Sequence, residues 1–207
     1  NPTSDLNGDD VASKLKILTA LSFNSFINNK TILIEGIKNI DQTDINNANH
    51  LGYKIKLLGV SDIKNKKITQ RVHPVFIKNN SHIAKINGVL NAVVAESKPV
   101  GQSVLQGEGA GSGPTTSSLV SDLCSVLRGN IKFPFVISNK KRQLAIFDTI
   151  NDKMFTVYLR LDVKDKHGIL SDITKIMAKN KVSIKRLIQN PTENKKNASI
   201  IIITHHA

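Results

Sequence analysis

The chain has 207 residues, of which 40% are hydrophobic and 22% are charged, and a formal net charge of +13; this length suits one large domain or two small ones. The positive charge invites a nucleic-acid partner, but the lysines form short clusters between apolar runs and only 4% of residues are aromatic, which favours solvated loops over a base-stacking surface. A single cysteine, Cys124, and the lack of any run near the ~20 apolar residues of a bilayer span exclude an internal disulfide, a cysteine-based metal site and a transmembrane helix. We therefore expect a cytoplasmic protein with no metal, nucleic-acid or membrane partner.

The hydrophobic pattern places helices first and a strand-rich block after them, which predicts an α+β fold with helices packed on a mixed sheet. In chain order, the expected elements are a helix over 10–27, a strand over 31–37, a helix over 41–52, strands over 53–63 and 67–77, a short helix or loop over 80–88, strands over 88–97 and 103–109, and a helix over 114–128. The lysine-rich residues 64–67 are expected to form a hairpin turn, and Pro74 is expected to break the alternation of the strand over 67–77.

The sequence changes character near residue 155. Residues 131–153 are mixed and charged and are expected to be a linker. The pattern after them predicts a strand over 156–163, a turn over 164–168, a helix over 169–180, and strands over 183–189 and 197–204. We therefore expect a second, small domain from about residue 155.

The first expected helix carries a carboxylate and an ammonium at helical spacing. Asp9 or Asp10 is expected to cap its start. Asp10 and Lys14 are four residues apart and so share one face. They form either a surface ion pair with no further role or a site that binds and protonates a small polar substrate, and the residues alone leave both open. The expected buried stripe of this helix consists of Val11, Leu15, Leu18, Leu21 and Ser22, with Ile17 beside them.

Residues 107–123 read GEGAGSGPTTSSLVSDL and place four glycines within seven residues, directly before a proline. The glycines lack the spacing of a dinucleotide fingerprint, and no lysine follows as in a phosphate-binding loop. One interpretation is a plain turn into the next helix. The other is a ligand contact, because glycines let a backbone approach a ligand closely and the N–H groups at a helix start favour an anion.

Several segments, taken in order, resemble the homoserine dehydrogenase family. PTSDLNGDDVASKLKIL, LGYKIKLL, NGVLNAV and GEGAGSGPTTSSLVSDL are similar to the catalytic half of that family. YLRLDVKDKHGILSDITKIMAKNKVSI is similar to the ACT domain that many bacterial members carry.

The resemblance implies a reaction, the reversible NAD(P)H-dependent reduction of L-aspartate 4-semialdehyde to L-homoserine. It implies that Lys14 protonates or polarises the carbonyl oxygen as hydride arrives, and that Asp10 binds the substrate hydroxyl or positions Lys14. Asp5 matches a further acidic residue of the substrate site. A placed ammonium suits this chemistry because reduction puts negative charge on oxygen. For the cofactor, NAD or NADP, the resemblance implies contacts from Gly107, Gly109, Ala110, Gly111 and Thr115.

The resemblance also implies a domain organisation. Residues 1–106 would form the catalytic domain, whose sheet makes a homodimer, residues 107–130 a glycine turn and a helix that returns to a nucleotide-binding domain, and residues 155–207 part of an ACT domain, after a linker over 131–154. The family's N-terminal nucleotide-binding domain and the end of the ACT domain are expected to be absent, so the chain alone is expected to be inactive. The apolar stripe of the returning helix is then expected to be partly exposed, at Leu119, Val120, Leu123, Val126 and Leu127.

An alternative from another class is an ACT-type amino-acid sensor without catalysis. In the turn KDKHG, His167 stands where the family usually has proline, next to Gly168, near which an amino-acid effector is implied. Amino-acid binding without dehydrogenase activity would favour this alternative.

Overall fold

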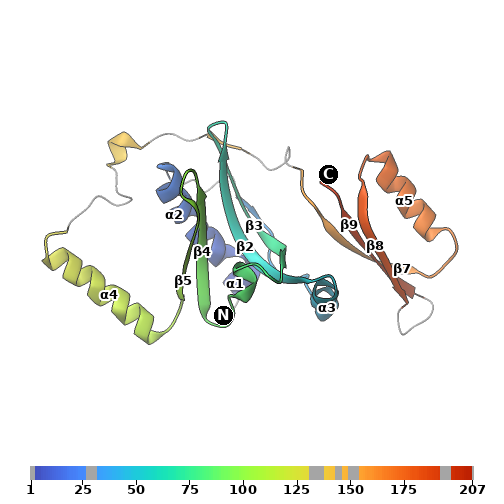
Figure 1. The fold of residues 1–207 in the computed structure, drawn as a ribbon, viewed down its shortest axis with the longest axis horizontal. Coiled ribbons are helices and arrows are strands. Elements are labelled where there is room, and N and C mark those ends of the chain that lie inside the picture. Colours follow the sequence, from blue (N-terminus) through green and yellow to red (C-terminus); the bar gives the residue numbers. More distant parts are fainter. Residues whose placement is uncertain are drawn as a thin grey trace. The chain divides into compact units, whose positions relative to one another are not determined.

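A computed structural model describes residues 3–26, 32–130, 138–142, 146–148, 154–191 and 197–206 of the chain. The chain forms two compact units, Asn1–Thr149 and Ile150–Ala207 (Figure 1). Both units combine helices with sheets, and the larger one mixes parallel and antiparallel strand pairs. The expected α+β class is confirmed.

Every helix and strand expected between residues 10 and 128 is present, with shifted ends. An additional short helix, α1, precedes them, and the helix expected over 10–27 ends at Phe23, where Asn24 follows with a φ of 52°. The last residue of the expected range lies outside the described residues. The elements of the first unit are α1 (Thr3–Asn7), α2 (Asp9–Phe23), β1 (Ile32–Ile34), α3 (Gln42–His50), β2 (Tyr53–Lys64), β3 (Lys67–Lys78), η1 (Ile83–Lys85), β4 (Leu90–Ser97), β5 (Gly101–Glu108), α4 (Ser112–Leu127), η2 (Asn139–Lys141) and β6 (Ile146–Phe147).

The antiparallel pair β2–β3 is the centre of the first unit. Its hairpin turn consists of Asn65 and Lys66, whose φ angles of 51° and 63° are those of a type I′ turn, which matches the twist of the strands. β1 and β6 both pair with β3 in parallel on its other edge. β6 lies within residues 131–153, the segment expected to be a linker. It pairs with the start of β3, and the N–H of Asp148 donates a hydrogen bond to the Ile68 carbonyl at 2.8 Å.

β3 runs through Pro74, as expected for the strand over 67–77. The strand continues to Lys78, and Pro74 pairs with Leu57. The carbonyl of Val72 accepts a hydrogen bond from Glu35 on the β1 edge, and residues two apart in a strand direct their backbone groups to the same edge. The missing N–H of Pro74 therefore falls on the edge beyond the end of β1, where no strand hydrogen bond is lost.

Helix α2 packs on the face of the sheet through small residues. Its N-cap is Gly8, with a φ of 87° that favours glycine, and no side chain caps this end, so the expected capping by Asp9 or Asp10 is wrong. A side chain at Gly59 of β2 would meet Val11 at 3.0 Å, and this glycine lets the helix approach the strand closely.

The buried face of α2 differs from the expected stripe. Leu15 is buried as expected, but the other buried residues are Ala12, Thr19 and Ala20. Leu21 is 46% exposed, and Ser22 is exposed too. Small residues face the sheet because the helix lies close to it, and larger side chains at those positions would clash.

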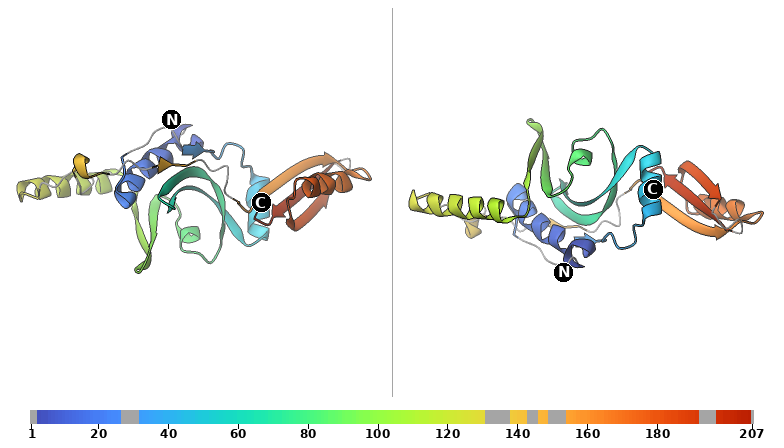
Figure 2. Two further views of the ribbon diagram at one scale, coloured as in Figure 1. Left: turned by 90° about the horizontal axis from the view of Figure 1, so that it is seen from above. Right: turned by 90° about the horizontal axis from the view of Figure 1, so that it is seen from below.

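Figure 2 shows β2 and β3 as a curved ribbon with η1 inside the curve and α2 outside it. Lysines on the inner face hold the η1 segment. Lys54 donates a hydrogen bond from Nζ to the carbonyl of Ala84 at 3.2 Å, and the Lys56 ammonium donates to the carbonyl of Ile86. Burial, followed by the repulsion of Lys54, lowers the pKa of Lys56 from its ordinary value.

The second unit contains β7 (Tyr158–Lys164), α5 (Ile169–Lys179), β8 (Ile184–Pro191) and β9 (Asn197–Thr204). These match the predicted strand, helix, strand and strand. β9 lies between β7 and β8 and is antiparallel to both. Its central isoleucines, Ile200, Ile201 and Ile202, are at most 2% exposed and form the core of this unit.

Candidate active site

Asp10 and Lys14 lie in the first turns of α2. The Asp10 carboxylate and the Lys14 ammonium are 2.7 Å apart, so the sequence-based expectation of an ion pair is confirmed. Their side chains are 42% and 58% exposed, which leaves both groups open to a small molecule. An exposed pair at this spacing contributes only about 0.3–0.5 kcal/mol to the stability of the fold. The pair is therefore a minor contribution to folding.

A buried hydrogen bond fixes the side of α2 that faces the sheet. The Gln70 side chain on β3 donates from Nε2 to the Thr19 hydroxyl at 2.9 Å. Gln70 and Thr19 are only 1% and 2% exposed. The bond sets the rotation of α2 about its axis, and the face with the Asp10–Lys14 pair is thereby directed to the solvent.

Asp5 lies on α1, directly before the site helix, and is exposed. Its backbone carbonyl accepts a hydrogen bond from the Gly8 N–H at 3.2 Å, which joins α1 to the start of α2. The loop after β1 holds α1 from the other side, because Ile37 donates its N–H to the Leu6 carbonyl at 2.9 Å. The fold therefore brings Asp5 to the same end of α2 as Asp10, although the ion pair of Lys14 is with Asp10.

The glycine turn lies between β5 and α4. Gly111 is the N-cap of α4 and has a φ of 124° with a ψ of 156°, a backbone conformation that favours glycine. Thr115 donates its hydroxyl to the Gly111 carbonyl at 2.7 Å, and this bond stabilises the first turn of the helix. Gly107, Gly109 and Ala110 are exposed. Among the described residues, no hydrogen bond or ion pair joins this turn to the Asp10–Lys14 pair.

Asn91 is a residue of this region to which the sequence analysis gave no role. It lies on β4 opposite Gly107, and its side chain occupies the space that a Cβ on Gly109 would need. The Cγ of Asn91 is 2.5 Å from that Cβ position. The family resemblance of the segment NGVLNAV was the one feature of the sequence that pointed to this residue. The segment contains two asparagines, Asn87 and Asn91, and their positions in the sequence do not indicate which of them contacts the turn.

The apolar stripe of α4 is exposed, as expected. No residue of this helix is buried. Between 53% and 77% of each stripe residue is exposed, at Leu119, Val120, Leu123, Val126 and Leu127. A contiguous apolar face of this kind indicates an interaction surface.

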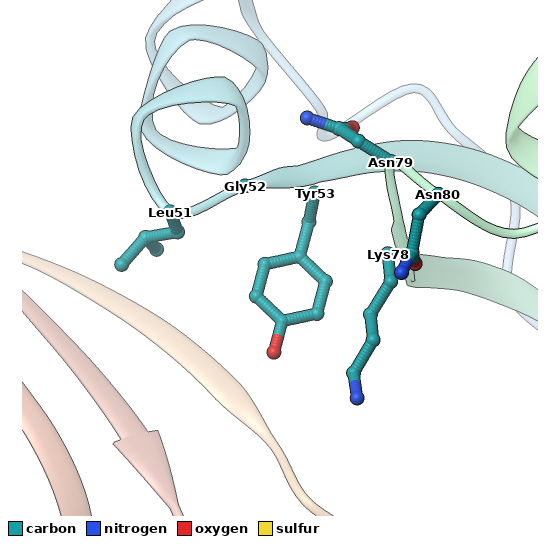
Figure 3. Close-up of a pocket in the computed structure, with 6 residues that line it drawn as sticks. All are labelled: Leu51, Gly52, Tyr53, Lys78, Asn79 and Asn80. Atoms are coloured by element: carbon teal, nitrogen blue, oxygen red, sulfur yellow. The ribbon is translucent and has the colours of Figure 1, made fainter.

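A shallow pocket of about 350 Å³ lies at the far end of the β2–β3 pair (Figure 3). The side chains of Tyr53 and Lys78 extend along one of its sides, and the Tyr53 ring lies 6.0 Å from that of Phe76. None of the site residues expected from the sequence lines it.

A second pocket, or hollow, lies in the smaller unit beside the turn between β7 and α5. It measures about 760 Å³ and is lined by Asp165, Lys166, His167 and Gln189. Gly168, the N-cap of α5, has a φ of 91° and leaves the helix start without a side-chain cap. His167, the expected departure from the ACT pattern, thus lies on the wall of this hollow.

Two further observations concern the described residues. They include no group of three or more histidine, cysteine, aspartate or glutamate side chains that could hold a metal ion. None of their helices is long and apolar enough to cross a membrane.

Comparison with known proteins gives one consistent family. The family model for homoserine dehydrogenase matches residues 1–124, and that for the ACT domain matches residues 157–207. The homoserine dehydrogenases of Neisseria gonorrhoeae and Helicobacter pylori are each 35% identical to this chain over 99% of its length, and the match covers 48% of each relative.

Solved structures that resemble this chain belong to the same family as these relatives. The crystal structure of a homoserine dehydrogenase from Thiobacillus denitrificans superposes with a TM-score of 0.88 at 34% identity and covers 100% of this chain and 48% of that one. The homoserine dehydrogenase of S. aureus at pH 7.5 gives a TM-score of 0.69 at 27% identity, over 100% of this chain and 50% of that one. The chain spans about half the length of the curated relatives it matches.

Proposed function

Because the chain belongs to the homoserine dehydrogenase family, we propose that it supplies the substrate-side half of an enzyme that interconverts L-aspartate 4-semialdehyde and L-homoserine. The observation that carries this proposal is the solvent-exposed Asp10–Lys14 ion pair at the start of α2. The activity belongs to the whole protein, of which this chain matches about half.

In the proposed reaction, Lys14 is the proton donor. During reduction, the carbonyl carbon of the semialdehyde gains a hydride, and the oxygen gains a proton from the Lys14 ammonium and becomes the hydroxyl of homoserine. In the reverse direction, the neutral Lys14 amine takes the hydroxyl proton back. Asp10 holds the ammonium at 2.7 Å and so orients it toward the substrate. Asp5, at the same end of α2, binds the substrate's ammonium group through its carboxylate.

The glycine turn fits a nicotinamide cofactor, either NAD or NADP. Among the described residues, a Cβ at Gly107 or Gly113 would meet no atom of another segment within 4 Å, so there is room for a ligand against the backbone. The start of α4 has no side-chain cap, and its N–H groups are available to an anion. When bound, the cofactor supplies or accepts the hydride. We assign the contact to Gly107, Gly109, Ala110, Gly111 and Thr115.

Four properties of the whole enzyme complete the proposal. It works in the cytoplasm, and two copies associate through the sheet of the catalytic domain, with residues 1–106 as that domain. The exposed apolar stripe of α4 packs against the nucleotide-binding domain. An amino-acid effector binds at the hollow of the ACT domain near His167 and Gly168.

The test is steady-state kinetics of the full-length enzyme with Lys14→Ala. General-acid catalysis is typically worth about 10²–10⁴-fold, so we expect kcat to fall by that factor while the Kd of NADPH stays within about twofold. Lys16→Ala, which removes a neighbouring lysine of α2, should leave kcat unchanged. Equal losses in kcat and in NADPH affinity would contradict the role of Lys14.

A second measurement tests the division of labour between the two halves. The 207-residue chain alone should not oxidise NADPH in the presence of aspartate semialdehyde, because the nucleotide-binding domain is required. Turnover by the chain alone would refute that requirement. Threonine binding by a full-length protein that has no dehydrogenase activity would favour an amino-acid sensor instead.

A further inference from the structure

Four glycines between the end of β5 and the first turn of α4 differ in what a Cβ would meet: Gly107, Gly109, Gly111 and Gly113. Gly111 has a backbone conformation that favours glycine, with its φ of 124°. Gly107 and Gly113 have no positive φ, and among the described residues a Cβ at either position would meet no atom of another segment within 4 Å. Gly109 also lacks a positive φ, but its side-chain space is filled by Asn91. The atoms nearest to this position belong to the end of the exposed Asn91 side chain.

The contact is made by the end of the Asn91 side chain. The amide nitrogen of Asn91 lies where the Cβ of residue 109 would be, and the Asn91 Cβ is 3.3 Å from that position. Across the hairpin, Asn91 pairs with Gly107, and the N–H of Gly109 donates to the Val89 carbonyl at 3.1 Å. A backbone hydrogen bond to Val89 and the contact with the Asn91 amide, both from the β4 side of the hairpin, thus meet the chain as it leaves β5.

We propose that Asn91 is a positioning residue of the dehydrogenase, whose amide packs on Gly109 and sets the path of the glycine turn against the nicotinamide cofactor. This inference rests on the proposed function of the turn. The turn is exposed along Gly107–Gly111, so its path is not set by burial in a core. A displaced turn would move the N–H groups at the start of α4 relative to the cofactor, and misplacement by about 1 Å can cost about 10²-fold in rate.

The experiment is a double-mutant cycle in the full-length enzyme with Asn91→Ala, Gly109→Ala and the combination of both. Gly109→Ala alone forces the new methyl group against Asn91, and we expect kcat/KM for NADPH to fall at least tenfold. In the combined variant the methyl group of residue 109 takes the place of the removed amide, and kcat/KM should recover at least threefold over Gly109→Ala. Non-additivity of this kind identifies direct contact.

Gly107→Ala is the matched control. It adds the same methyl group two residues away, where no atom of the chain lies within 4 Å. The factor by which Gly107→Ala changes kcat/KM for NADPH should be the same in the wild-type background and in the Asn91→Ala background. Equal coupling at both glycines, or additivity at Gly109, would overturn the proposal.

Two readouts separate positioning from a general loss of fold. A shifted turn raises the KM for NADPH and leaves the KM for the semialdehyde unchanged, whereas a loss of folded enzyme lowers the apparent kcat and changes neither KM. Unchanged KM values in the Asn91→Ala and Gly109→Ala variants would therefore overturn the positioning role. Wild-type enzyme without any turnover would instead refute the proposed function, and the same cycle in melting temperatures then tests the contact between Asn91 and Gly109 by itself.

Discussion

Gly36 is the position at which a single methyl group should disturb the candidate site most directly. It lies in the loop after β1, where its backbone meets α1. A Cβ on Gly36 would overlap the Leu6 carbonyl oxygen and lie 2.8 Å from the Cα of Asn7. Both obstacles are backbone atoms, so no side-chain rotation can relieve the clash. The φ of Gly36 is not in the left-handed region, and the effect of Gly36→Ala is therefore purely steric.

The cost follows from two contributions. Overpacking of this kind costs about 1–3 kcal/mol. Moving α1 away also breaks the hydrogen bond from the Ile37 N–H to the Leu6 carbonyl, and such a bond contributes about 1 kcal/mol. The sum of roughly 2–4 kcal/mol corresponds to a decrease of about 30- to 1000-fold in the equilibrium that holds α1 in place.

Hydrogen exchange measures this equilibrium at a single amide. The protection factor of the Ile37 amide should fall at least about 30-fold in Gly36→Ala. Gly113→Ala is the control, because its Cβ meets no atom within 4 Å, and it should leave the protection of Ile37 unchanged. In the full-length enzyme, the KM for the semialdehyde should rise because Asp5 moves with α1. Unchanged protection of Ile37 in Gly36→Ala would refute the close contact between Gly36 and Leu6.

Two further predictions concern the sheet that supports the site. Thr19→Val should lower the free energy of unfolding by about 1–3 kcal/mol in urea titrations, because the buried Gln70 amide loses its acceptor; adding Gln70→Leu should restore most of the loss, and additive losses would contradict this account. Lys56 has a pKa below its ordinary value of 10.5 in the folded state, so in the alkaline range just below that value the unfolded chain binds more protons and stability rises with pH. The free energy of unfolding of wild type relative to Lys56→Gln should therefore increase with pH in that range, and a decrease would contradict the lowered pKa.

Local features of the fold were predictable from neighbouring residues in the sequence. A helix was expected from residue 41, and Asp41 is the N-cap of α3: its side chain accepts the N–H of Asp44 while the Asp44 side chain accepts that of Asp41. The Asp10–Lys14 pair likewise follows from the four-residue spacing on a helix. Such interactions depend on only one turn of chain, so a sequence pattern is enough to indicate them.

Features that depend on a distant partner were not predictable. The periodicity of α2 favoured Leu21 as a buried residue, yet Thr19 is buried instead because Gln70, 51 residues away, supplies its hydrogen-bond partner. The strand β6 forms by pairing with β3. Its two residues are too few to show the alternating pattern that predicts a strand.

The order of helices and strands, the Asp10–Lys14 pair and the family resemblance are all readable from the amino-acid sequence, because they depend on spacing along the chain. Only the folded chain shows which face of α2 is buried, how Gly36 contacts the α1 segment that carries Asp5, and that Asn91 lies against Gly109. Each of these depends on the space left by another segment: the Leu6 carbonyl at Gly36, and the amide of Asn91 at Gly109. Excluded volume between distant segments leaves no periodic pattern in the sequence.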